Sequence, residues 1–201
     1  MRPEVLSTAR PSPLRLAGFL CLAVGALTAG AGAARAWATI GIVGDTLGAA
    51  DVPWHGTDVW EGKVVLFAAV VALLATLWMR LSASSVGRRA LAILLVLIGL
   101  VTTALSLVDA ARARDRFGGA AGLDRMVTWT SAEVGLPEDV VREQLADVLE
   151  EGTRIDLEPG IWVSATGGLL LVAGGVLSLA WAHRRGAARG ASPDGLPPGP
   201  T

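Results

Sequence analysis

The residues that could bind a metal ion gather in one acidic stretch, 41–61. His55 lies there near the carboxylates of Asp51, Asp58 and Glu61, and an imidazole together with carboxylates can hold a divalent cation. A histidine-based site normally uses a second histidine at a fixed spacing, and this stretch has none. We therefore predict no metal site and interpret the stretch as a packed loop.

Residues that could catalyse a reaction do not form a recognisable set in the sequence. Glu150 and Glu151 are adjacent, so on a helix their side chains diverge by about 100° and do not form a catalytic pair. His55 and His183 lie at opposite ends of the apolar runs described below, and Cys21 is the only cysteine. No nucleophile elbow, phosphate loop or paired-cysteine motif is present. We predict a protein that is not an enzyme, with no cofactor and no surface for nucleic acid.

Four apolar runs dominate the sequence, which is 52% hydrophobic and only 17% charged. Crossing a bilayer takes about 20 residues in a helix. The uncharged runs are 16–34, 90–108 and 161–182, with a shorter one at 64–79. Lys63 and Arg80 flank the short run, and their long side chains can reach the headgroups. The sequence predicts an all-α fold, a four-helix transmembrane bundle whose first partner is the lipid bilayer.

Basic residues predict the orientation of the bundle, because segments rich in arginine stay in the cytoplasm. The N-terminal segment, the loop between the second and third runs and the C-terminal segment hold nine of the 17 basic residues but two of the 18 acidic ones. The bases are Arg2, Arg10, Arg15, Arg80, Arg88, Arg89, Arg184, Arg185 and Arg189; the acids are Glu4 and Asp194. We therefore predict that both termini are cytoplasmic. Trp37, Trp78, Trp162 and Trp181 lie at the predicted span ends, where an indole suits the headgroup level.

The first run has a second interpretation as a cleaved signal peptide. Arg10 and Arg15 precede it, and Ala34-Arg35-Ala36 resembles a cleavage site with small residues. The run is longer than most signal-peptide cores. We expect the segment to be retained, and the cleaved form stays open as the alternative.

Small residues predict how the spans pack, since lipid provides no hydrophobic drive between helices. The fourth run carries a stripe with spacings of four and three, and the first run carries small residues at similar spacing. The stripe of the fourth run is Ser164, Gly168, Gly175 and Ser178, with Gly167 and Gly174 beside it, and that of the first run is Gly18, Gly25, Ala29 and Gly32. We predict that spans one and four pack closely through these stripes.

The segment between the third and fourth runs, 110–160, is predicted to be helical and outside the membrane. Thr130-Ser131-Ala132-Glu133 has the pattern of a capping box and predicts a helix start. Over 137–151, proline at the first position, acids in the first turn and Gly152 just past the end predict an amphipathic helix.

A candidate partner surface lies on the two outer segments. It comprises Trp54, Trp60 and the apolar stripe Val141, Leu145, Val148 and Leu149. The stripe could bind another protein or this chain's own first outer loop, and the intramolecular interpretation is favoured. An envelope protein and a second copy of this chain are the partners we consider.

Two glycine-rich passages resemble a known group of proteins. The stretch 55–63 leads directly into the second run, and Gly160-Ile161-Trp162 opens the fourth run, which carries the pairs 167–168 and 174–175. This layout is similar to small four-span membrane proteins of actinobacteria, such as the tryptophan-associated transmembrane proteins. The resemblance covers about 100 residues and implies a topology without an activity. The segment 109–160 has no counterpart in it.

The sequence thus predicts a multi-pass plasma-membrane protein, most simply a non-enzymatic accessory or interaction protein of the cell envelope. The alternative is a small transporter or channel subunit that works as an oligomer. The predicted segments are a cytoplasmic tail 1–13, spans 14–37, 62–82, 90–109 and 161–182, outer segments 38–61 and 110–160, a cytoplasmic loop 83–89 and a disordered cytoplasmic tail 183–201.

Overall fold

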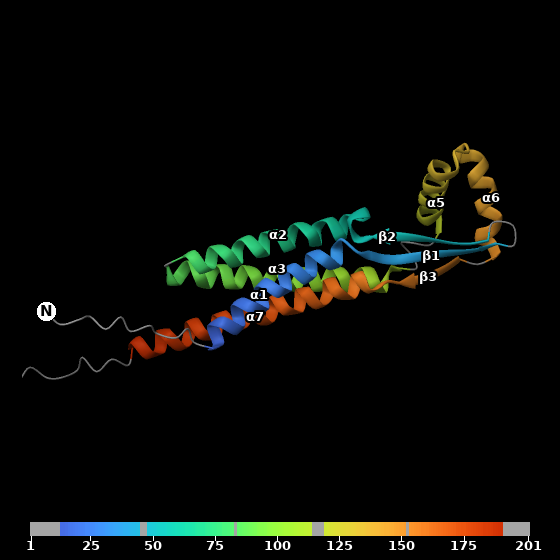
Figure 1. The fold of residues 1–201 in the computed structure, drawn as a ribbon. Coiled ribbons are helices and arrows are strands. Elements are labelled where there is room, and N and C mark those ends of the chain that lie inside the picture. Colours follow the sequence, from blue (N-terminus) through green and yellow to red (C-terminus); the bar gives the residue numbers. More distant parts are fainter. Residues whose placement is uncertain (1–12, 45–47, 83, 114–118, 152, 191–201) are drawn as a thin grey trace, which may run out of the picture.

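Four long helices form the body of the protein. The computed structural model describes residues 13–44, 48–82, 84–113, 119–151 and 153–190. All four helices are long and apolar enough to cross a membrane, as expected for a multi-pass membrane protein. They are α1 (Pro13–Ala33), α2 (Trp60–Leu81), α3 (Ser85–Ala111) and α7 (Pro159–Gly190). Figure 1 shows them side by side as an elongated bundle. The predicted four-helix fold is confirmed.

Helix α7 is the central packing element of the bundle. It lies against α1 on one side and against α3 on the other, while α2 packs on both α1 and α3. Leu22, Leu95 and Leu171 are fully buried where these helices meet. The outward faces carry exposed apolar side chains such as Phe67 and Leu97. Apolar faces of this kind suit lipid and would be unfavourable in water.

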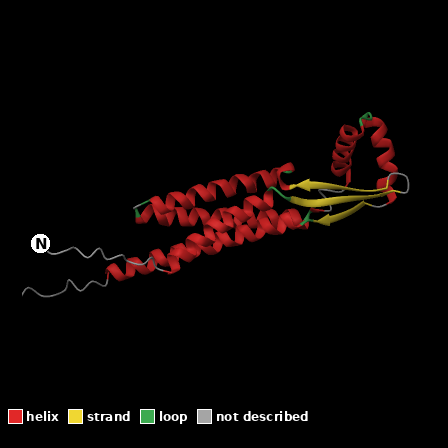
Figure 2. Ribbon diagram, viewed as in Figure 1, coloured by secondary structure: helices red, strands yellow, loops and turns green. Residues whose placement is uncertain are grey.

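An antiparallel sheet extends from one end of the bundle, which we call the sheet end (Figure 2). Its strands are β1 (Ala36–Gly44), β2 (Gly48–His55) and β3 (Thr153–Leu157), in the order β2-β1-β3. In the central strand β1, Thr39 pairs with Pro53 of β2 on one side and with Asp156 of β3 on the other. The sequence predicted no strand in either outer segment. The first outer segment, 38–61, was predicted to be a packed loop, but it contains most of β1, all of β2 and a short helix.

A β-bulge joins the sheet to the bundle. Ala36 pairs with His55 and Ala38 pairs with Trp54, so Trp37 is one extra residue on β1. A bulge turns the strand locally and redirects a side chain. Trp37 is fully buried in the bundle end, and its Nε1 donates a hydrogen bond to the carbonyl oxygen of Gly32 at 3.0 Å. The prediction that Trp37 anchors the chain at the headgroups is therefore wrong, because the indole is fully buried inside the protein and exposes no surface to headgroups.

Glycines allow the chain to pass close to Trp37. The 3₁₀ helix η1 (Gly56–Asp58) lies between β2 and α2. A Cβ on Gly56 would lie 2.5 Å from Nε1 of Trp37, and one on Gly62 would overlap the backbone of Gly56. Both positions therefore require the smallest residue.

Two further helices cover one face of the sheet. They are α5 (Gly119–Val134) and α6 (Glu138–Glu151), and Figure 1 shows them at the far end of the strands. Gly135 links them with a φ of 71°, a left-handed conformation that glycine adopts without strain. Arg142 of α6 contacts Asp124 of α5 at 2.6 Å. The capping-box prediction at Thr130 is wrong, since α5 continues through that position and ends at Val134, just before Gly135.

Predicted boundaries of three helices also differ from the structure. Helix α3 begins at Ser85 rather than at 90, so most of the predicted loop 83–89 is helical. Helix α1 ends at Ala33 rather than at 37, because the chain already enters β1 at Ala36. Helix α7 continues to Gly190, so residues 183–190 are helical and not a disordered tail. Alanine and arginine are good helix formers, and basic residues are favourable near the C-terminal end of a helix.

Candidate functional site

The small residues predicted for span packing lie at the interfaces of α7, on two of its faces. Towards α1, a Cβ on Gly18 would lie 3.1 Å from the Oγ of Ser178, and one on Gly25 would lie 2.9 Å from the backbone nitrogen of Leu171. A Cβ on Gly32 would meet Ser164, whose Oγ donates to the carbonyl of Ala29 at 3.4 Å. These helices therefore approach backbone to backbone.

Gly168 and Gly175 do not take part in that contact. A Cβ on Gly168 would lie 2.8 Å from the carbonyl oxygen of Gly99, and one on Gly175 would lie 2.5 Å from a methyl group of Val96. Both partners belong to α3. The contact with α1 is made instead by the neighbouring Gly167 and Gly174, which the sequence analysis placed next to the stripe and not in it. Each glycine pair thus serves two helices, one residue facing α1 and the next facing α3.

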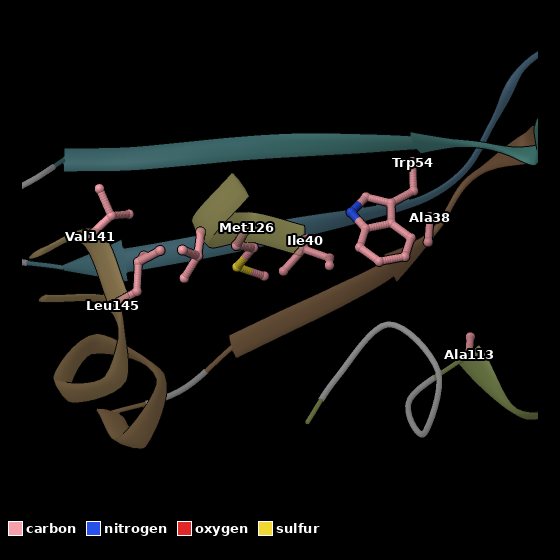
Figure 3. Close-up of a cluster of buried hydrophobic side chains, with 8 residues drawn as sticks. Ala38, Ile40, Trp54, Ala113, Met126, Val141 and Leu145 are labelled. Carbon is pink, nitrogen blue, oxygen red and sulfur yellow. The ribbon is translucent and has the colours of Figure 1, made fainter. Parts of the chain in front are cut away.

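The sheet, α5 and α6 enclose a second hydrophobic core, which we call the outer core (Figure 3). Three predicted surface residues are buried in it: Trp54 of β2, and Val141 and Leu145 of α6. They pack with Ile40 of β1 and Met126 of α5. This burial corresponds to the intramolecular interpretation of the apolar stripe, and these three side chains are not available to another protein. The side chains of Val148 and Leu149 lie outside the described residues.

Other apolar side chains remain exposed at the sheet end. Trp60, at the first position of α2, is 74% exposed. Beyond the bundle, the helical hairpin of α5 and α6 exposes four large apolar residues, which we call the hairpin tip: Trp129, Val134, Leu136 and Val140. They belong to the part of the chain that extends beyond the four-helix bundle (Figure 1). Sequence periodicity did not single them out, since they surround a turn and do not form a helical stripe.

Within the acidic stretch that could have bound a metal, His55 and Asp58 form a turn at the surface. The Nδ1 of His55 lies 3.7 Å from the Oδ2 of Asp58, and the same carboxylate oxygen accepts a hydrogen bond from the backbone nitrogen of His55 at 3.0 Å. Both side chains are largely exposed. Among the residues that the structure describes, no three His, Cys, Asp or Glu side chains gather as metal ligands would.

A row of polar side chains is buried on α3 near the sheet end. Thr102, Ser106 and Asp109 lie at spacings of four and three, hence on one helix face, and each is at most 2% exposed. Within the described part of the chain, the hydroxyls of Thr102 and Ser106 have no hydrogen-bond partner. By contrast, Thr76 and Thr103 each donate to the carbonyl four residues earlier. We call Thr102, Ser106 and Asp109 the polar row. The sequence predicted Asp109 to be the last residue of the span. Helix α3 in fact continues to Ala111, and the side chain of Asp109 is buried.

Replacing Thr102 by valine is expected to leave stability unchanged or to raise it by about 1 kcal/mol, because burying a hydroxyl without a partner costs free energy that a methyl group avoids. The neighbouring Thr103 provides the matched control. Its Oγ1 donates to Gly99 at 2.9 Å and approaches the carbonyl of Ala165 at 3.4 Å, so Thr103→Val should lose about 1 kcal/mol. Unfolding of both variants in detergent tests this; a larger loss for Thr102→Val than for Thr103→Val would mean that the Thr102 hydroxyl is bonded.

Comparison of the sequence with protein-family models gives no match, and comparison with curated proteins gives none either. The chain itself consists of a four-helix bundle joined through Trp37 to an outer core, with an exposed hairpin tip and a buried polar row.

Proposed function

We propose that this chain is a non-enzymatic protein of the plasma membrane that binds a protein of the cell envelope through its hairpin tip. In this proposal both termini are cytoplasmic, and the sheet with α5 and α6 lies outside. The arginine distribution supports the orientation, because Arg15, Arg80, Arg88 and Arg89 all belong to the end of the bundle away from the sheet.

The observation that carries the proposal is the exposed apolar surface of the hairpin tip. Trp129 is 46% exposed and Val134 is 60% exposed, although both belong to the part of the protein that water would surround. Exposed apolar side chains that gather into a patch mark contact surfaces for other proteins or for membranes. Aromatic residues such as Trp129 are enriched at the centres of such contacts.

Site-specific photo-crosslinking tests the proposal. A photoreactive amino acid replaces Leu136 at the hairpin tip, or replaces Gln144 on the exposed side of α6 as the control. In intact cells, we expect a discrete adduct from position 136, none from position 144, and loss of the adduct when Val140→Glu is added. Equal adducts at both positions would contradict a specific surface. An adduct with twice the mass of the chain would assign the tip to a second copy instead. A Leu145→Glu variant is unsuitable, because Leu145 is buried in the outer core and its change would unfold the domain.

The polar row favours a second candidate function, a small transporter or channel subunit that works as an oligomer. Buried polar side chains in a membrane bundle are costly and often line the path of a solute. Here the row continues from Thr102 to Asp109 along the inner face of α3. Flux into vesicles that contain the purified chain tests it: flux that disappears with Thr102→Val and Ser106→Ala would support a transporter, and vesicles without flux would remove this candidate.

A further inference from the structure

Arginines and aromatic rings form a cluster at the end of the bundle away from the sheet. The guanidinium of Arg15 lies over the ring of Trp181, 5.5 Å from its centre, and that of Arg88 lies 5.8 Å from the same centre. Arg89 donates to the carbonyl oxygen of Ala182, with a distance of 3.5 Å. Residues of α1 and α3 therefore bring two guanidiniums to the indole of α7, and a third to the backbone carbonyl of the next residue. We call Arg15, Arg88, Arg89 and Trp181 the arginine cluster.

The cluster lies one membrane thickness away from the sheet. Trp181 is 22 residues beyond Pro159, where α7 begins at the sheet end. At the helical rise this is a distance of about 33 Å, which slightly exceeds the hydrocarbon core of a bilayer, about 30 Å. If the sheet lies just outside one surface, the arginine cluster lies at the headgroups of the other surface.

The two helices that carry the arginines of the cluster have no acidic residue beside them. Arg15 belongs to the start of α1, and Arg88 and Arg89 to the start of α3; neither helix has an acidic residue in its first turn. A helix N-terminus already carries partial positive charge, so these positions disfavour cations and favour an anion. The described parts of α1 and α3 thus place arginines, and no carboxylate, near this end of the bundle.

The sequence provides few carboxylates that could neutralise these arginines. Residues 5–44, 64–108 and 159–193 contain no aspartate or glutamate. In the three segments at this end, Glu4 and Asp194 are the acids, and both lie outside the described residues. With the sheet just outside one surface of the bilayer, the phosphate groups of the other surface would lie near the depth of Trp181.

We propose that the arginine cluster binds the headgroup phosphate of an anionic phospholipid. A planar guanidinium can donate two hydrogen bonds to one phosphate, and basic pockets between membrane helices bind acidic headgroups. The indole of Trp181 holds the side chains of Arg15 and Arg88 in place through cation–π contacts, and its own ring suits the interface. The lipid would connect the starts of α1 and α3 to α7. The proposal goes beyond the proposed function: it requires a bilayer but neither a partner nor a particular orientation.

Native mass spectrometry of the full chain in detergent, titrated with phosphatidylglycerol or phosphatidylcholine, measures this binding. We expect the wild-type protein to retain phosphatidylglycerol more tightly. Each arginine near a surface contributes about fivefold to binding an anionic lipid, so R15Q and R88Q should each weaken it about fivefold and R15Q/R88Q about thirtyfold. The matched control R35Q/R112Q removes two exposed arginines at the sheet end and should retain wild-type affinity.

Several outcomes would overturn the proposal. Equal affinity of R15Q/R88Q and R35Q/R112Q would mean that charge alone, and not the cluster, attracts the lipid. If the double variant does not fold, the two single variants decide, since each keeps one guanidinium on Trp181. Displacement of the lipid by an equal concentration of inorganic phosphate would assign the site to free phosphate. A large gain of affinity in E4Q/D194N would show that the chain's own termini occupy the cluster.

Discussion

Replacing Gly167 by alanine is expected to destabilise the bundle by about 3 kcal/mol. The added Cβ would overlap the backbone of Ala29, so α1 and α7 would have to move apart along their whole contact. Extra atoms in a packed interior typically cost 1–3 kcal/mol, and here the obstacle is backbone, which cannot rotate away. Alanine is the better helix former, so the loss would occur in spite of a gain of about 1 kcal/mol in helix propensity. Thermal unfolding in detergent, followed by far-UV circular dichroism, measures the change.

Gly30→Ala is the matched control, because it makes the same change on the face of α1 that meets α2. A Cβ there would lie 3.5 Å from the Cβ of Ala69, an ordinary contact. We expect Gly30→Ala to be neutral or to stabilise the protein by up to about 1 kcal/mol. The two substitutions should therefore have opposite signs. A Gly167→Ala protein as stable as Gly30→Ala would contradict the close contact between α1 and α7.

Trp37→Ala should cost about 3–5 kcal/mol and should separate the sheet from the bundle. The indole is fully buried where Ala33, Val65 and Ile161 meet, and its Nε1 is bonded to Gly32. Removing a large aromatic side chain from such a site leaves a cavity that the surroundings cannot fill. Trp37→Phe keeps most of the volume but loses the hydrogen bond, so its cost should be smaller.

Limited proteolysis together with thermal unfolding measures the separation. In Trp37→Ala, sites on the sheet and on α5 and α6 should be cut faster than in wild type, while the bundle stays resistant in detergent. Trp60→Ala is the control, since that side chain is 74% exposed, and changes at exposed positions are usually within about 0.5 kcal/mol. If both tryptophan variants behave alike, Trp37 does not connect the two parts.

The four spans could be predicted because their signal is local. Each run is long, apolar and uncharged, and these properties suffice to predict a membrane helix. The sheet could not be predicted in this way. Strand β3 is only five residues long and pairs with β1, which lies more than 100 residues earlier. The segment 36–44 directly follows an apolar helix, so its first two residues were assigned to the first span and the rest to an outer loop.

The packing of α7 was predicted in part. The glycines of α7 were correctly predicted to lie at helix interfaces. They were assigned to one stripe facing α1, although Gly168 and Gly175 face α3. Residues 167 and 168 are adjacent, and adjacent positions on a helix diverge by about 100°; one therefore meets α1 and the other meets α3. Composition shows that small residues are needed, but only the arrangement of the helices shows which neighbour each one serves.

The candidate surfaces were harder to predict for a related reason. Val141 and Leu145 form a regular apolar stripe, and such a stripe does not reveal whether its partner is the same chain or another one. The chain itself covers these residues with Ile40 and Met126. The exposed residues of the hairpin tip surround Gly135 and lack helical periodicity, so no pattern pointed to them. The arginine cluster depends on helix starts that are far apart in the sequence.

The most direct test of the account is the location of the two ends of the bundle relative to the membrane. In a Cys21→Ala background, single cysteines replace Ser85, at the start of α3, or Glu138, at the start of α6; both positions are exposed. A membrane-impermeant maleimide is added to intact cells and then to lysed cells. We predict that Glu138→Cys is labelled in intact cells and that Ser85→Cys is labelled only after lysis. Labelling of both positions under the same condition would contradict the four-span arrangement.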